Sequence, residues 1–373
     1  MEFHSTSVRR WFAVFLALPF AGFASGAEKK PKADPQAVTE LKQALELIKA
    51  KQFDPAFEKL QGITVRFPKD PAAENAQKLL REYGVGKEVR IVLEDREFFR
   101  SKLKIPDESI LDMEEKIFGE LRAHYKPFPA RYKTCSLRAI LYDSQARFRE
   151  KGGSVTSSGH YRVAKQNRRA GILDGKIEWY FPREASIPKD RQLFMKSLLY
   201  HETAHHLNQI HFDGAIPSIL DEGLATHFTS RLNTETYQHY RQTDRQRFER
   251  EARNAVNSIQ KYDDFARMLD GGRGFGQGDI MVDRWYGLCY SIVDFFAEGE
   301  LESKKLGLDG LLGLIEEATK PAAGPGEADA KPAAGRPPMK EFLAKLVEKS
   351  YGAKVEDFHR GLIKHILARY KQR

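Results

Sequence analysis

One short motif, HETAH at residues 201–205, combines side chains that can bind a metal and move a proton. Residues four apart on an α-helix lie on one face, so His201 and His205 can both turn a ring nitrogen toward one ion. Imidazole is a common ligand of Zn²⁺, with bonds of about 2.0–2.1 Å. Glu202 leans over the same cleft, where its carboxylate can take a proton from water that the metal activates. The motif predicts a zinc site with its own general base, provided that this stretch is helical.

A catalytic zinc needs a third protein ligand and one open position, and two residues compete for that role. His211 completes the spacing H-E-x-x-H-x-x-G-x-x-H that is typical of the metzincins, except that Asn208 stands in place of the glycine. Asparagine tolerates a left-handed turn better than most residues, so this difference does not exclude His211. The other candidate is Glu222, which is separated from His205 by sixteen residues and lies in a second helix that Pro217 could open.

The stretch ILDEGLA at 219–225 resembles a segment of the gluzincins, the clan of thermolysin-like and aminopeptidase-like metallopeptidases. That segment has the form W-L-x-E-G-x-A, and Ile219 here replaces its tryptophan. The resemblance covers most of residues 86–373 and is to exported bacterial gluzincin domains that are often fused to tetratricopeptide repeats. It implies that Glu222 is the third zinc ligand, and we prefer it to His211 because the chain has no convincing Met-turn of the metzincin kind.

The same resemblance extends to WYGLCYSIVDFF at 285–296, which fits a helix of pattern Y-x-x-S/C-x-x-L/I-V-x-F. It implies that Tyr286 donates a hydrogen bond to the oxyanion of the tetrahedral intermediate. The neighbouring apolar residues also form a stripe that suits a buried core, in which an aromatic residue is ordinary packing. Tyr290 is the second candidate for the donor.

Strand patterns precede the motif and helical patterns follow it, which predicts an α+β fold with a small mixed sheet and a mainly helical zinc lobe. We expect strands at 88–95, 136–143, 159–166 and 175–181, with a helix at 107–124. Further helices are expected at 190–210, 217–231, 235–268, 283–297, 339–350 and 354–370. The Pro/Ala/Gly-rich stretch 319–338 reads as a flexible insertion within this domain, which spans 86–373.

Residues 35–84 have apolar side chains at helical spacing, interrupted by turn signals at 50–53 and 67–73. This pattern resembles a tetratricopeptide repeat, as one helix pair followed by the first helix of another. One and a half repeats cannot bury a solenoid core alone. The segment is therefore either a helical cap on the main domain or a module that binds a protein partner.

The first 26 residues have the form of a secretory signal peptide, with Arg9 and Arg10 before an apolar run at 11–24 and small residues after it. The apolar run is shorter than the ~20 residues of a membrane span, so an uncleaved anchor is the weaker alternative. We therefore expect an exported protein with no membrane span after cleavage. In an oxidising compartment Cys135 and Cys289 could pair, although two buried thiols fit the count better.

The net charge of +9 comes from 61 basic and 52 acidic residues, so the excess is mild. No compact basic stripe with interleaved aromatics indicates a nucleic-acid site. The sequence thus predicts an exported zinc metallopeptidase that acts on a peptide or protein substrate. The alternative is a non-catalytic scaffold that contains zinc and recruits a partner through its N-terminal helices.

Overall fold

The computed structural model describes residues 33–50, 52–82, 88–93, 96–104, 116–125, 132, 134–153, 157–167, 171–182, 185, 187–271, 279–319 and 338–370. Within these ranges the fold is α+β, as the sequence predicts. The expected signal peptide and nearly all of the expected insertion at 319–338 lie outside the described residues.

The described strands form one mixed sheet of four strands in the order β1-β2-β4-β3. Their bounds are Glu88–Leu93 for β1, Thr134–Tyr142 for β2, Gly159–Asn167 for β3 and Ile172–Tyr180 for β4. The first three in spatial order run parallel, and β3 pairs with β4 in the antiparallel sense, with a bulge between Val163 and Lys165. Every strand lies within three residues of its predicted bounds, and β3 occupies an edge of the sheet.

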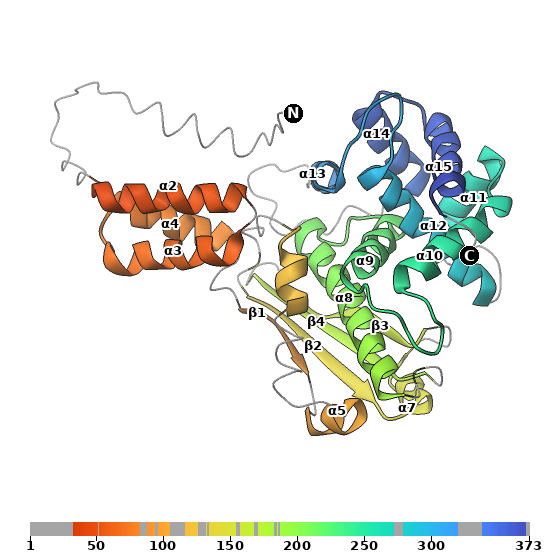
Figure 1. The fold of residues 1–373 in the computed structure, drawn as a ribbon, viewed down its shortest axis with the longest axis horizontal. Helices are drawn as coiled ribbons and strands as arrows, with labels where there is room; N and C mark the ends of the chain where they lie inside the picture. Colours follow the sequence, from red (N-terminus) through yellow and green to blue (C-terminus); the bar gives the residue numbers. More distant parts are fainter. Residues whose placement is uncertain are drawn as a thin grey trace.

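One face of the sheet packs against α8 (Pro188–Phe212), which runs across it in Figure 1. Side chains of a strand alternate between faces, and Leu173, Ile177 and Trp179 of β4 are fully buried on this side. Gly175 belongs to the same set. A Cβ atom there would lie 2.6 Å from His206 Nδ1, so the glycine lets the helix approach the strand.

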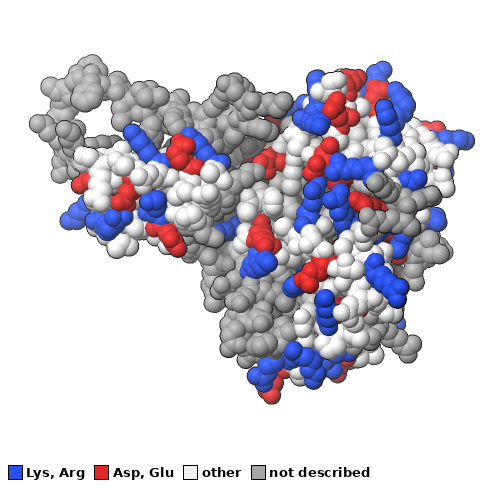
Figure 2. Space-filling model, in the orientation of Figure 1, with Lys and Arg blue, Asp and Glu red and all other residues white. Residues whose placement is uncertain are grey.

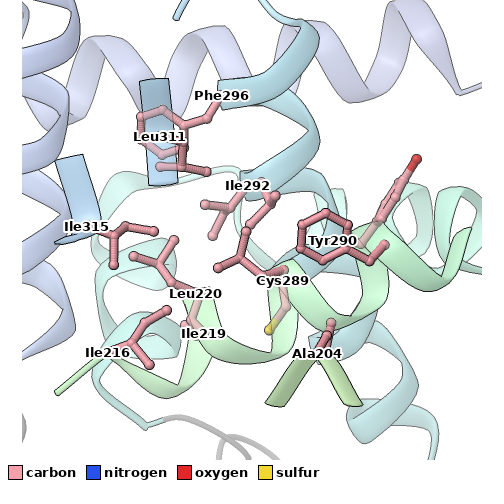
Figure 3. Packing of buried hydrophobic residues seen from close by; sticks show 14 of the residues in the cluster. Ala204, Ile216, Ile219, Leu220, Cys289, Tyr290, Ile292, Phe296, Leu311 and Ile315 are labelled. Atoms are coloured by element: carbon pink, nitrogen blue, oxygen red, sulfur yellow. The ribbon is translucent and has the colours of Figure 1, made fainter. Parts of the chain in front are cut away.

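Three further helices pack on one another beside α8, and α9 contacts it directly: α9 (Ser218–Leu232), α10 (Asp244–Ala255) and α12 (Asp279–Glu298). In Figure 3, Ala204 of α8, Leu220 of α9 and Cys289 of α12 lie in one cluster of buried side chains. A Cβ atom at Gly223 of α9 would lie 2.5 Å from the Cys289 carbonyl oxygen, so this glycine allows α9 and α12 to pack closely. Cys135 and Cys289 are both buried and are not joined by a disulfide.

The single helix predicted at 235–268 is wrong. The structure has a β-bridge between Tyr237 and Gln242, then α10, the 3-10 helix η1 (Val256–Ser258) and α11 (Tyr262–Gly271). A contact from α8 explains the non-helical start: the carboxylate of Asp190 accepts hydrogen bonds from the backbone N–H groups of residues 238 and 239, at 2.8 and 3.0 Å. A capping box at Thr243 then opens α10.

Other helices complete the lobe. The structure contains α14 (Met339–Tyr351) and α15 (Val355–Arg369) where the sequence predicts them. It also contains three helices that the sequence reading left unassigned, α5 (Arg96–Leu103), α7 (Gln145–Glu150) and α13 (Leu308–Thr319). Of the helix predicted at 107–124, the structure describes residues 116–124, and these are helical up to residue 122.

The N-terminal helices are α2 (Pro35–Lys49), α3 (Phe53–Arg66) and α4 (Pro71–Glu82), with turns where the sequence predicts them. They lie to the left in Figure 1. They share a hydrophobic cluster of their own, made of Ala37, Leu41, Ala44, Phe57, Leu60, Ile63, Ala72, Ala73, Ala76 and Leu80. The segment thus has a small core that is distinct from the core of the main lobe.

The surface in Figure 2 carries basic and acidic side chains interleaved on the face that is visible there. This arrangement agrees with a net charge of +9 that is spread over many residues of both signs. Among the described helices, none combines the length and the apolar character that crossing a membrane requires.

Candidate metal centre

The structure brings His201, His205 and Glu222 together between α8 and α9. The Glu222 Oε2 atom lies 3.2 Å from His201 Nε2 and 3.5 Å from His205 Nε2. The two Nε2 atoms are themselves 3.2 Å apart. In the described part of the chain, these three residues form the group of possible ligands that could hold a metal ion.

The spacing of these atoms fits zinc. Ligands at about 2.0–2.1 Å in a tetrahedron lie about 3.3–3.4 Å from one another, and the three distances fall on either side of that value. Glu222 is 5% exposed and His205 9% exposed in their side chains, so the carboxylate and this imidazole are largely removed from water. A carboxylate oxygen beside two imidazole nitrogens in such surroundings favours a cation between them. The residues present therefore fit the metal that the motif predicts.

The helix α8 continues through Asn208 and ends at Phe212, where Asp213 adopts the left-handed conformation with φ of 54°. The metzincin-like alternative requires the chain to turn back at Asn208 instead. His211 accordingly lies two turns beyond His205, and its ring packs against Tyr125 with ring centroids 5.4 Å apart. The structure does not bring His211 into the group with His201 and His205.

Asp221 contributes to the site in a way that the sequence reading missed. An acidic residue in the first turn of α9 is ordinarily just a favourable charge at a helix start, yet the Oδ1 atom of Asp221 lies 3.0 Å from His205 Nδ1. A carboxylate at this distance can accept a hydrogen bond from Nδ1–H, which would leave the Nε2 lone pair free for a metal. The acidic pair at 221–222 next to a predicted ligand was the available signal, because ligating histidines usually donate to a carboxylate.

Asp244 is a second buried carboxylate near the site, on α10. Its side chain accepts a hydrogen bond from Asn233 Nδ2 at 2.8 Å. Burial raises its pKa, while Arg247, hydrogen bonds from Asn233 and Ser197, and the charge of His201 act in the opposite direction. The interaction with His201 means that each of the two histidines has an acidic residue in its surroundings.

The two residues predicted to act on substrate are both neighbours of His201, one in sequence and one through a ring contact. Glu202 is the next residue on α8 and is 5% exposed. Tyr286 comes from α12, and its ring centroid lies 6.2 Å from that of His201. The second candidate, Tyr290, lies one turn further along α12. It is fully buried, stacks on His227 and donates a hydrogen bond to Asp294 at 3.4 Å. Of the two tyrosines, Tyr286 is the one with a contact to the group.

The remaining histidines of the motif region serve packing. His206 faces the sheet, where its Nδ1 atom is 3.1 Å from the Tyr161 hydroxyl, and burial lowers its pKa to about 3. His227 is buried between α9 and α12, and burial lowers its pKa to about 4. Both imidazoles are therefore neutral at physiological pH, which suits an apolar environment.

Comparison with known protein families, with curated proteins and with solved structures finds no match for this chain.

Proposed function

We propose that the chain is an exported zinc-dependent peptidase of the gluzincin kind. One observation carries the proposal: the Nε2 atoms of His201 and His205 and one oxygen of Glu222 converge at distances of 3.2–3.5 Å, beside Glu202. These three residues would hold a zinc ion through three of its four positions and leave one for water or substrate, as a catalytic zinc requires.

Zinc bound by these residues would lower the pKa of water and polarise the carbonyl of a scissile peptide bond. Glu202 takes the proton from the attacking water and delivers it to the leaving amine. Its low exposure keeps bulk water away from the carboxylate during this transfer. Tyr286 donates a hydrogen bond to the oxyanion that develops on the substrate.

The substrate pairs with β3, whose outer edge has no neighbour in the described sheet. A Cβ atom at Gly159 would lie 2.5 Å from Leu198 Cδ1, so the start of β3 lies against α8 three residues before His201. Strand addition at this edge satisfies the backbone hydrogen bonds of an extended peptide, whatever its side chains. This edge is therefore suited to present a peptide bond beside the zinc ligands.

The test compares the wild-type chain and Glu202→Gln, both loaded with zinc, on a broad peptide library. We expect the wild type to cleave peptides and the variant to bind an equal amount of zinc without cleaving. Because Gln is nearly isosteric with Glu but cannot accept the proton, the comparison isolates the base. Equal cleavage by both proteins would sink the proposal.

The second candidate function is a non-catalytic scaffold, which the separate core of α2–α4 favours. In that case α2–α4 recruit a protein partner and the metal has a structural role. A structural zinc is closed by four protein ligands. The absorption spectrum of the Co²⁺-substituted protein distinguishes the two functions, because it responds to an added zinc-binding inhibitor only if one ligand is exchangeable.

A further inference from the structure

A chain of three close polar contacts, two of them hydrogen bonds between side chains, leads from His205 into the protein interior. His205 Nδ1 lies 3.0 Å from Asp221 Oδ1, and Asn208 Nδ2 donates to that same oxygen at 2.7 Å. The Tyr125 hydroxyl in turn donates to Asn208 Oδ1 at 2.7 Å. The chain thus connects α8 and α9 with the helical segment that precedes β2.

The direction of each hydrogen bond is determined by chemistry. Tyr125 is 2% exposed, and burial, reinforced by the charge of Asp221, raises its pKa well above the usual value, so the hydroxyl keeps its proton. The opposite orientation of the Asn208 amide would place its oxygen against the carboxylate of Asp221, acceptor against acceptor. Asn208 therefore presents its NH₂ group to Asp221, and Asp221 remains an acceptor for the Nδ1–H of His205.

We propose that Asn208 and Tyr125 are positioning residues that act through Asp221 to hold His205 in the tautomer whose Nε2 can bind metal. The proposal rests on the zinc site proposed above. It explains why an asparagine stands at 208, where its amide bridges an aromatic hydroxyl and a carboxylate instead of forming a turn. A network of this kind is rigid only when every member is satisfied, so loss of one link loosens the others.

The test measures zinc affinity by competition with a chelator in Asn208→Leu and Tyr125→Phe. Loss of a group that orients a ligand costs about 10- to 100-fold in metal affinity, which is the decrease expected for Asn208→Leu. Tyr125→Phe acts one bond further away, and we expect a decrease of about 3- to 10-fold, below the range for direct partners.

Tyr132→Phe is the matched control. Tyr132 is 1% exposed, and its hydroxyl donates to Asp213 Oδ1 at 2.8 Å, at the end of the same helix α8. Tyr132→Phe removes this hydrogen bond, and also the one that the hydroxyl accepts from Gln166 Nε2 at 2.5 Å, without touching the chain to His205. We expect zinc affinity within about 2-fold of wild type, since no partner of a ligand changes. Thermal unfolding of the metal-free proteins shows whether all variants fold.

A second measurement needs no metal. In the metal-free wild type, ¹⁵N chemical shifts of His205 should report a protonated Nδ1 and an unprotonated Nε2, and Asn208→Leu should shift the population toward the other tautomer.

The outcomes of the two tests are distinguishable. The proposal alone is overturned if Asn208→Leu and Tyr125→Phe bind zinc as tightly as Tyr132→Phe does, or if the tautomer of His205 is unchanged. A wild type that binds no zinc overturns it together with the site. Decreased affinity in a chain that cleaves no peptide leaves the proposal standing and rejects the peptidase function.

Discussion

The helical lobe contains two buried groups that each combine a carboxylate with two histidines, and they differ in how their atoms meet. Around Glu222, one carboxylate oxygen lies within 3.5 Å of the Nε2 atoms of both histidines. Around Asp294 of α12, His365 Nε2 lies 3.0 Å from one oxygen and His227 Nδ1 lies 4.0 Å from the other. The nitrogens of the second group therefore do not converge on a single point where an ion could lie.

The Asp294 group is instead held together by donors and positive charges. The Tyr370 hydroxyl donates to Asp294 at 2.9 Å, and guanidinium groups of Arg231 and Arg369 lie 3.9 Å away. Burial alone raises the pKa of Asp294, but the hydrogen bonds from His365 and Tyr370 and the charges of His227 and Arg369 outweigh it and lower the pKa to about 2. The same residue types thus give a structural link between α9, α12 and α15 in one place and a metal-binding geometry in the other.

The largest expected effect is on zinc affinity in Glu222→Ala. The site then loses one of three protein ligands. Loss of a ligand's hydrogen-bond partner alone costs about 10- to 100-fold in metal affinity, so loss of the ligand itself should lower zinc affinity by more than this. Peptidase activity should disappear with the zinc. His211→Ala is the control, because His211 lies outside the group and should leave zinc affinity near that of wild type. The reverse ranking, measured by chelator competition, would restore the metzincin-like assignment.

Asp294→Ala should produce the opposite pattern. Removing one member of a buried pair typically costs about 3–5 kcal/mol, and here the largely buried His365 loses its carboxylate partner. We expect the free energy of unfolding in urea to fall by about that amount while one zinc per folded chain is retained. Loss of zinc from the folded variant would show that the two groups are not independent.

The two tyrosines of α12 sharpen the same contrast. Tyr286→Phe should lower kcat by about 10²- to 10³-fold, the usual cost of one oxyanion donor, with little change in unfolding free energy. Tyr290→Phe removes a hydroxyl that hydrogen-bonds to Asp294, so stability should fall by about 1 kcal/mol while kcat is retained. Unchanged kcat in Tyr286→Phe would remove this residue from the proposed machinery.

The last prediction concerns pH, and it changes neither group of histidines and carboxylate at neutral pH. Burial lowers the pKa of His227 from 6.5 to about 4, so on acidification the unfolded chain takes up this proton before the folded chain does. The free energy of unfolding is therefore unaffected by this histidine above pH 6.5, and it falls by about 3 kcal/mol as the pH falls toward 4. His227→Phe should show a flatter decline of unfolding free energy between pH 6.5 and 4. A decline as steep as that of wild type would assign the acid sensitivity to other groups.

Local sequence signals were sufficient for much of the fold and for the three converging residues. The i, i+4 spacing of His201 and His205 depends only on helix geometry, and the strand bounds follow from alternation and turn residues. The segment at 235–268 has helical composition throughout. Its first part is nevertheless a turn, because Asp190 from a distant part of the chain binds its backbone. Composition alone cannot reveal such a contact.

The positions of Asp221 and Asn208 depended on tertiary packing in the same way. Whether an acidic residue at the start of α9 reaches His205 is set by the distance between α8 and α9, which the sequence does not specify. Asn208 looked like a substituted glycine in a turn, whereas the structure places it inside α8 as a donor to Asp221. The two histidines were thus predictable from spacing and Glu222 from the gluzincin-like segment, whereas the contacts of Asp221 and Asn208 were not.

The most direct test of the central claim is a crystal structure of the zinc-loaded protein with anomalous diffraction data at the zinc edge. The account predicts one strong peak per chain, within about 2.0–2.1 Å of His201 Nε2, His205 Nε2 and an oxygen of Glu222, with a fourth position taken by water. A peak bound by other side chains, a site closed by four protein ligands, or no zinc in the protein would contradict it.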